Sequence, residues 1–141
     1  MSAKKILVVE DDRPSAIILS YKLRNSGYDV VTAGDGSEAV ALAKGEHPDL
    51  MILDLGLPAK DPFSGPNWDG FSVMDWLRRT QSEQMPIIVV TAWDSAKAQK
   101  RALDAGAIAY FQKPARYDEL LATIKNALGE APGAPQSQPA A

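Results

Sequence analysis

Five polar side chains of this sequence stand at the ends of short apolar runs, and their types fit the chemistry of phosphate groups. A carboxylate can act as a nucleophile that forms a covalent acyl phosphate. Neighbouring carboxylates can hold a divalent cation, while an ammonium and a hydroxyl group can contact the oxygens of a phosphoryl group in transfer. The residues concerned are Glu10, Asp11, Asp54, Thr91 and Lys113.

The three acids among these residues are expected to share a magnesium ion. Like charges about 4 Å apart repel by ~1 kcal/mol in water and by ~4 kcal/mol at an effective dielectric constant near 20. A positive group should offset that repulsion, and Mg²⁺ takes hard oxygen ligands of this kind. Capping of the next helix remains an alternative role for Glu10 and Asp12. It does not explain Asp54, because a loop at residues 55–58 follows this acid.

Lys113 is followed by Pro114, and the short apolar run before the lysine aims it toward the same edge as the acids. A peptide bond before proline adopts the cis form at a cost of only ~0.5–1 kcal/mol, and a cis bond would fix the direction of the lysine. We therefore predict that the Lys113–Pro114 bond is cis.

Apolar runs without polar alternation predict strands that are covered on both faces, as in a parallel sheet. Strands are expected at residues 6–9, 28–33, 50–53, 87–90 and 109–112. Helices are expected at residues 14–25, 37–44, 70–81, 95–103 and 117–128, with Ser37 and Asp69 as candidate N-caps. This alternation predicts an open, doubly wound α/β fold with helices on both faces, which binds ligands beyond the carboxyl ends of its strands.

The chain has 141 residues, a length typical of one domain. Hydrophobic residues make up 45% and charged residues 23%, which excludes a wholly disordered chain. The sequence has no cysteine and a net charge of -3, so it predicts no thiol nucleophile, no Cys–zinc site and no nucleic-acid surface. Without a membrane span or a signal peptide, we expect a cytoplasmic domain over residues 1–128 and a disordered tail rich in Pro, Ala and Gln over residues 129–141.

Five short motifs follow one another along residues 4–128. They are Ile6-Leu-Val-Val-Glu-Asp-Asp, Leu53-Asp54 with Pro58 four residues on, Asp69-Gly70, Val90-Thr91-Ala92 and Gly106-Ala107-x-x-Tyr110-x-x-Lys113-Pro114. Each motif alone is weak, but all five in order form a specific signal. Taken in order, they resemble the receiver domain of the two-component response regulators, and in particular its single-domain, chemotaxis-regulator-like members. The resemblance implies the flavodoxin-like strand order 2-1-3-4-5 for the five parallel strands.

The resemblance implies that Asp54 is the phosphoacceptor, which takes a phosphoryl group from the phosphohistidine of a sensor histidine kinase or a phosphotransfer protein. Asp11 would then bind Mg²⁺ directly, Glu10 would bind it through water, and the backbone carbonyl of Gly56 would supply another ligand beside Asp54. Such a chain catalyses its own phosphorylation and dephosphorylation, and it is not a turnover enzyme on an external substrate.

The resemblance also implies a switch. Thr91 and Lys113 would contact the phosphoryl oxygens, which bring about -1.5 to -2 units of charge. Tyr110 would rotate inward when the threonine moves, although its position alone indicates only a half-buried strand tyrosine. A downstream protein would then dock on the face made by the fourth helix, the fifth strand and the fifth helix, without direct contact to nucleic acid and without membrane insertion.

Two features depart from the pattern of the family. Residues 59–68 stand where receivers usually have only two residues. This insertion is either a tolerated surface loop, since loop length costs little, or a lid or partner-selecting loop anchored by Phe63 or Trp68. Trp93, two residues after Thr91, either shields an acyl phosphate from water or contacts a partner.

Other classes of phosphate-binding protein fit less well. A hydrolase of the haloacid dehalogenase type also uses an Asp nucleophile with Mg²⁺, but it needs a second Asp where this chain has Gly56. A flavodoxin-type domain would present a phosphate loop after the first strand, where the acids at residues 10–12 would repel phosphate. The alternative that stays open is a phosphorylation-independent receiver that acts as a protein-binding module.

Overall fold

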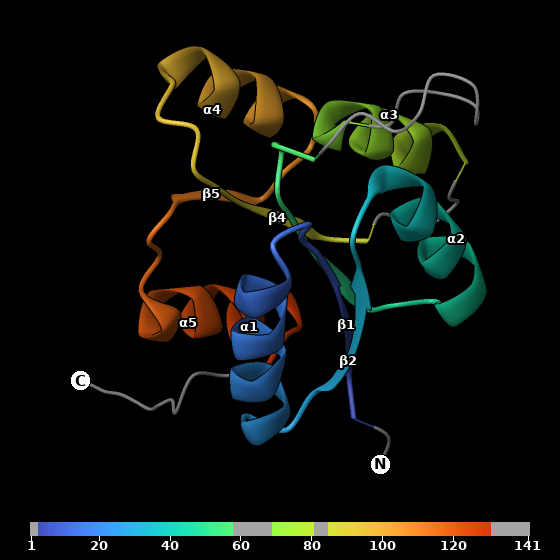
Figure 1. Cartoon of the computed structure of the whole chain (residues 1–141), viewed down its shortest axis with the longest axis vertical. Coiled ribbons are helices and arrows are strands. Elements are labelled where there is room, and N and C mark those ends of the chain that lie inside the picture. Colours follow the sequence, from blue (N-terminus) through green and yellow to red (C-terminus); the bar gives the residue numbers. More distant parts are fainter. Residues whose placement is uncertain (1–2, 58–68, 81–84, 131–141) are drawn as a thin grey trace.

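The computed structural model describes residues 3–57, 69–80 and 85–130, in which strands and helices alternate along the chain (Figure 1). The strands are β1 (Lys5–Val9), β2 (Asp29–Ala33), β3 (Leu50–Leu53), β4 (Ile87–Thr91) and β5 (Ala109–Gln112). The helices are α1 (Arg13–Asn25), α2 (Gly36–Glu46), α3 (Gly70–Thr80), α4 (Ala96–Asp104) and α5 (Tyr117–Ala127). All ten predicted elements are present, and their ends differ from the predicted ones by at most two residues.

The strands form one parallel sheet in the order β2-β1-β3-β4-β5, which confirms the order implied by the family resemblance. β1 pairs with β3 in a register that sets Val9 opposite Leu53. Every residue of β3 and β4 is buried, as expected for strands that are covered on both faces.

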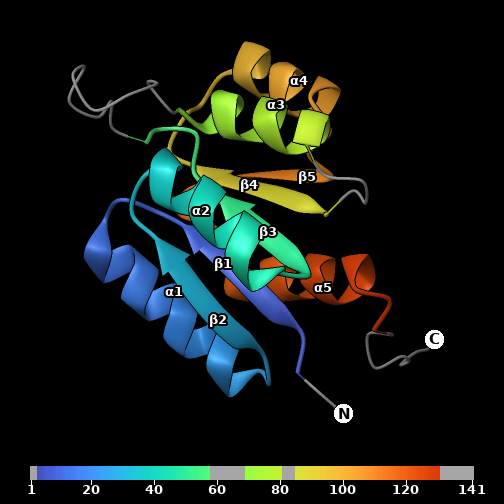
Figure 2. The same cartoon turned by 90° about the vertical axis from the view of Figure 1, so that its right-hand side faces the viewer.

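The helices cover the two faces of the sheet unequally (Figures 1 and 2). α1 and α5 lie on one face, and α2, α3 and α4 lie on the other. Because side chains alternate along a strand, each strand supplies both layers of core. Leu7 and Val9 of β1 pack in the layer toward α2, α3 and α4, whereas Ile6 and Val8 pack in the layer toward α1 and α5. None of the described helices is long and apolar enough to cross a membrane.

Short polar side chains begin most of the helices. Asp12 caps α1 by accepting a hydrogen bond from the backbone N–H of Ser15 at 3.1 Å. Asp69 accepts from the N–H of Ser72 at 2.7 Å, as predicted for the start of α3. The prediction of Ser37 as the cap of α2 was wrong, because the helix begins at Gly36 and the carboxylate of Asp35 accepts the hydrogen bond.

Candidate functional site

The polar residues predicted to do chemistry lie together at one edge of the sheet. All strands are parallel, so their carboxyl ends meet at this edge. Glu10 follows β1 and Asp54 follows the neighbouring β3, and the N–H of Asp54 donates to the carbonyl of Val9 at 3.0 Å. Thr91 ends β4, and Lys113 follows β5, with its N–H donating to the carbonyl of Thr91 at 2.7 Å. The backbone ladder of the sheet therefore sets the spacing of these side chains.

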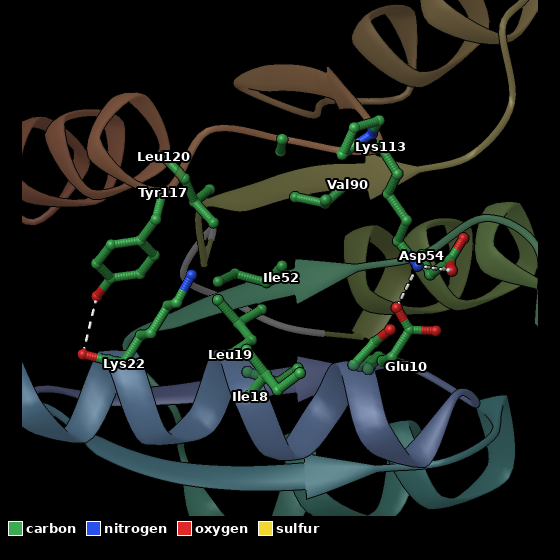
Figure 3. A pocket seen from close by; sticks show the side chains of 15 residues that line it. Glu10, Ile18, Leu19, Lys22, Ile52, Asp54, Val90, Lys113, Tyr117 and Leu120 are labelled. Carbon is green, nitrogen blue, oxygen red and sulfur yellow. Dashed lines mark hydrogen bonds and ion pairs between the residues drawn. The ribbon is translucent and has the colours of Figure 1, made fainter.

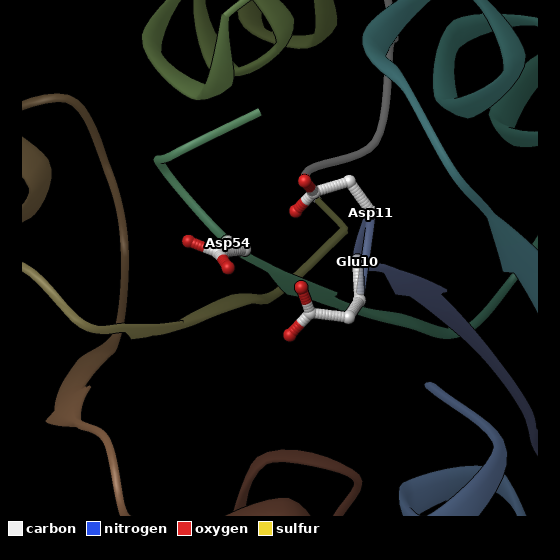
Figure 4. Close-up of side chains that lie close together, drawn as sticks. All are labelled: Glu10, Asp11 and Asp54. Atoms are coloured by element: carbon white, nitrogen blue, oxygen red, sulfur yellow. The ribbon is translucent and has the colours of Figure 1, made fainter. Parts of the chain in front are cut away.

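Three carboxylates gather at this edge (Figure 4). Glu10, Asp11 and Asp54 each offer an oxygen, and these oxygens lie within 4.8 Å of one another. Glu10 is 8% exposed and Asp54 7% exposed, whereas Asp11 is exposed. The cluster is thus closed toward the core and open toward solvent on the Asp11 side, and its donor set of oxygens suits Mg²⁺.

Lys113 supplies positive charge between the two buried acids. Its Nζ lies 2.9 Å from Oδ2 of Asp54 and also forms an ion pair with Glu10. The peptide bond between Lys113 and Pro114 is cis, as predicted. The lysine therefore offsets part of the repulsion that the sequence had indicated for this edge.

The two buried acids have pKa values that move in opposite directions. Burial raises the pKa of Glu10, and the hydrogen bonds from Lys113 and from the N–H of Asp12 only partly compensate. Burial also acts to raise the pKa of Asp54, but hydrogen bonds from Lys113 and Gly56, with a contribution from Thr91, bring that pKa below its ordinary value. Asp54 is therefore ionised at neutral pH, which a carboxylate nucleophile requires.

Each oxygen of Asp54 has its own hydrogen-bond donor. The backbone N–H of Gly56 donates to Oδ1 at 2.9 Å, while Lys113 donates to Oδ2. The loop that carries Gly56 is held by α3, because a Cβ on Gly70 would lie only 2.7 Å from the Cα of Leu55. The close approach of α3 to this loop therefore requires glycine at position 70.

Thr91 and Tyr110 both form hydrogen bonds with the backbone of Trp93, at the border of the site. Thr91 is fully buried, and its hydroxyl accepts a hydrogen bond from the N–H of Trp93 at 3.4 Å. Tyr110 is half-buried, and its hydroxyl donates to the carbonyl of Trp93 at 2.8 Å. The side chains predicted as the switch are thus joined through one backbone segment, Thr91 to Trp93.

A cavity beside the site was not anticipated from the sequence (Figure 3). It has a volume of about 500 Å³, lies between α1 and α5, and is mostly apolar. Glu10, Asp54 and Lys113 line one end, while Lys22 and Tyr117 lie at the other end. A signal was present in α1, which carries more apolar residues than its buried face needs: Ile17, Ile18 and Tyr21 are 63%, 57% and 67% exposed.

Two predictions lie outside the described residues. The insertion at residues 59–68, with the proposed anchors Phe63 and Trp68, falls in the undescribed range 58–68. The tail predicted for residues 129–141 is described only as far as Glu130, whose side chain accepts a hydrogen bond from the hydroxyl of Tyr28 at 2.6 Å.

Fold and site together define a class: a doubly wound α/β domain with an acidic, lysine-bearing pocket at the carboxyl edge of its sheet. A sequence profile of the response regulator receiver domain matches residues 6–125. The chain belongs to this family of receiver domains.

Solved structures agree with this assignment. A CheY-like receiver domain from Methanospirillum hungatei JF-1 is 30% identical, with a TM-score of 0.79 and coverage of 92% of this chain and 96% of that one. The BeF3-activated receiver domain of Klebsiella pneumoniae RstA is 31% identical, with a TM-score of 0.78 and coverage of 89% and 98%. The chemotaxis protein CheY4 of Vibrio cholerae is 28% identical, with a TM-score of 0.77 and coverage of 90% and 100%.

Proposed function

We propose that this chain is a phosphoacceptor response regulator in which Asp54 receives a phosphoryl group from the phosphohistidine of a sensor histidine kinase or a phosphotransfer protein. The observation that carries the proposal is the environment of Asp54: an ionised carboxylate, 7% exposed, with Lys113 at 2.9 Å and two further acids beside it. A receiver that served only as a binding module would have no need to bury two like charges next to each other with a third beside them.

The proposed transfer of the phosphoryl group exchanges one bond to phosphorus for another. A carboxylate oxygen of Asp54 forms a bond to phosphorus while the bond from phosphorus to the histidine nitrogen breaks, and the electron pair of that bond stays on the imidazole. Lys113 already lies against Asp54, so its ammonium can follow the developing charge onto a phosphoryl oxygen with little movement. The Thr91 hydroxyl would be the second group to contact those oxygens.

The acidic cluster fits a magnesium ion. Asp11 and Asp54 would hold the ion directly, Glu10 through water, and the backbone carbonyl of Gly56 would complete the protein ligands. When bound, Mg²⁺ neutralises charge on the transferring phosphoryl group. The arrangement of one exposed and two buried acids supports this assignment, because Mg²⁺ keeps several waters and needs an open side.

The phosphodonor has an apolar surface on which to dock. Ile17, Ile18 and Tyr21 are exposed on α1, and Ile18 also lines the cavity that runs to Asp54 (Figure 3). Contiguous exposed apolar side chains of this kind mark protein contact sites. We assign this α1 surface, defined by Ile17, Ile18 and Tyr21, to the donor protein.

The output is proposed to lie on the other side of the site. A phosphoryl group that draws in the Thr91 hydroxyl would move the segment from Thr91 to Trp93, and Tyr110 is tied to this segment through the carbonyl of Trp93. The change would reach a downstream protein at the surface of α4, β5 and α5. The working unit would be residues 1–128, in the cytoplasm, where ATP-dependent kinases supply the phosphohistidine.

The direct test is phosphorylation by a small donor. Incubation with acetyl phosphate and Mg²⁺ should add one phosphoryl group, as detected by mass spectrometry of the intact protein. Asp54→Asn should abolish the adduct, and EDTA should strongly reduce it. Asp75→Asn, which removes an exposed acid of α3, is the matched control and should be labelled like the wild type. A wild-type protein that takes no phosphoryl group would leave the binding module as the better assignment.

A further inference from the structure

Three side chains from three segments stack beside the site. The guanidinium of Arg101 in α4 lies over the ring of Phe71 in α3, at 3.9 Å from the ring centroid. The Phe71 ring in turn lies 6.3 Å from the Trp93 ring, centroid to centroid, at an angle of 45°. This geometry joins a cation–π contact to a tilted aromatic pair. α3 and α4 lie side by side on their face of the sheet (Figures 1 and 2).

The Trp93 end of this stack lies near Asp54, on the side of Gly56. A Cβ added to Gly56 would lie 3.4 Å from Nε1 of Trp93 and 3.5 Å from Oδ1 of Asp54. The indole edge is thus separated from the carboxylate by the space that one small side chain would fill, and glycine leaves that space free. Hydrogen bonds with Tyr110 and Thr91 hold the backbone of Trp93, and the contact with Phe71 acts on its ring.

The three side chains of the stack differ in how far they are exposed to solvent. Phe71 is 7% exposed and belongs to the core between the sheet and α3, whereas Trp93 is 43% exposed. Arg101 is exposed on α4. The buried Phe71 ring therefore lies between the exposed Arg101 and the partly exposed Trp93 indole. Arg101 and Phe71 lie in helices, so either contact can be changed by a substitution outside the strands of the sheet.

We propose that Arg101 and Phe71 are positioning residues that hold the Trp93 indole over the Gly56 side of the site, where it limits the access of water to a phosphoryl group on Asp54. The proposal rests on the proposed phosphorylation of Asp54. In the hydrolysis that it limits, the oxygen of water bonds to phosphorus and the bond from phosphorus to the Asp54 oxygen breaks. The electron pair returns to the carboxylate, and inorganic phosphate leaves with the protons of the water.

On this proposal, α4 would be a surface from which a partner could change the lifetime of the phosphoryl group. A partner that binds α4 and lifts Arg101 away from Phe71 would loosen the indole and speed the loss of phosphate.

The test first measures the position of Trp93 in unphosphorylated protein. In a background with Trp68→Phe and Trp76→Phe, Trp93 is the remaining tryptophan, and quenching of its fluorescence by acrylamide reports its exposure. Arg101→Ala and Phe71→Leu should increase quenching, because each removes one contact of the stack. Arg101→Lys and Phe71→Tyr keep the cation and the ring, and they should restore wild-type quenching.

The second measurement follows the loss of phosphate. After labelling with acetyl phosphate and removal of the donor, Arg101→Ala and Phe71→Leu should shorten the lifetime of the phosphoryl group at least about threefold. Lys100→Ala removes a neighbouring cation of α4 that pairs with Asp104, and it should change neither measurement. Thermal unfolding of each variant separates a loosened indole from a loosened domain.

The outcomes are distinct. Unchanged quenching in both Arg101→Ala and Phe71→Leu would overturn the positioning role, and so would a more exposed indole with an unchanged phosphate lifetime. A wild-type protein that accepts no phosphoryl group would overturn the proposed function and the control of lifetime with it, while the quenching data would still decide whether Arg101 and Phe71 position Trp93.

Discussion

At the scale of single residues, Lys113 pairs with two buried acids, and a fall in pH changes the stability of the fold in opposite directions through the two of them. The pKa of Asp54 lies below its ordinary value, so its contribution to stability is present above the unfolded-state pKa and is lost as the pH falls through the folded-state pKa. The pKa of Glu10 is raised by burial, so acidification through that pKa favours the folded state. Hydrogen bonds to both acids raise the pKa of Lys113 in spite of its burial, so it remains charged throughout this range.

Replacing Lys113 with methionine should therefore destabilise the protein at about pH 7 and change how stability depends on pH. Removing one partner of a buried ion pair costs about 3–5 kcal/mol, and the low end applies because 28% of the lysine side chain is exposed. Without the ammonium, burial would raise the pKa of Asp54, so the acid-induced loss of stability that Asp54 causes in the wild type should disappear. Urea unfolding at pH values from about 7 to about 3 measures both effects.

The matched control for this variant is Lys100→Met, which breaks an exposed pair on α4. Such pairs contribute at most about 1 kcal/mol, so its urea midpoint should stay close to that of the wild type at every pH. If Lys113→Met were as stable as Lys100→Met at neutral pH, the lysine would not be the group that neutralises Glu10 and Asp54.

At the scale of elements, α1 combines a buried face with an exposed apolar face. Its buried residues, Ala16, Ser20 and Leu23, face the sheet. Ile17, Ile18 and Tyr21 are nevertheless exposed to solvent. Burying these side chains against a partner would stabilise the complex by roughly 25 cal/mol per Å² of apolar surface. The exposed face stands next to the carboxyl edge of the sheet, so a donor that covers it also faces Asp54.

Ile18→Asp should consequently slow phosphorylation by a protein donor without affecting a small one. With a phosphorylated histidine kinase that labels the wild type, the rate of transfer should fall at least about tenfold, because a charge would have to be buried in the contact. Labelling by acetyl phosphate requires no docking and should keep its rate. Ile108→Asp places the same charge on an exposed isoleucine just before β5, at the opposite edge of the sheet, and should leave both rates unchanged.

Element boundaries show what local patterns can and cannot predict. The runs that became β1, β3 and β4 were predicted because buried parallel strands need uninterrupted apolar residues. The cap of α2 was misassigned because Asp35 and Ser37 are both good caps, and only the geometry of the chain decides between them. The exposed side of α1 went unrecognised because periodicity identifies apolar residues without stating which of them find a partner.

At the scale of the whole molecule, the gathering of Glu10, Asp54, Thr91 and Lys113 was predictable because it follows from parallel strands alone. The strand order was not contained in the alternation of strands and helices, and it came from the likeness of the motifs to a known family. The cavity between α1 and α5 and the stack of Arg101, Phe71 and Trp93 depend on how side chains of distant segments pack. No periodicity in one segment encodes such contacts.

The same gathering should make the stability of the whole domain sensitive to divalent cations. Three carboxylate oxygens within 4.8 Å of one another repel, and Lys113 pairs with only the two buried acids. A cation that binds the folded chain alone stabilises it by about 2.7 kcal/mol at a concentration of 100 Kd. Excess MgCl2, compared with EDTA, should therefore raise the midpoint of thermal unfolding by several degrees.

Asp11→Asn should remove most of this rise, because Asp11 is the exposed member of the cluster and its loss leaves the contacts of Lys113 with Glu10 and Asp54 in place. In EDTA, the variant should unfold at the same temperature as the wild type or higher, since one repelling charge is gone. Asp29→Asn, at the amino end of β2 and so at the opposite edge of the sheet, should respond to MgCl2 like the wild type. An equal rise in all three proteins, measured by calorimetry, would place the cation away from this cluster and leave the acids without the ion that makes their proximity tolerable.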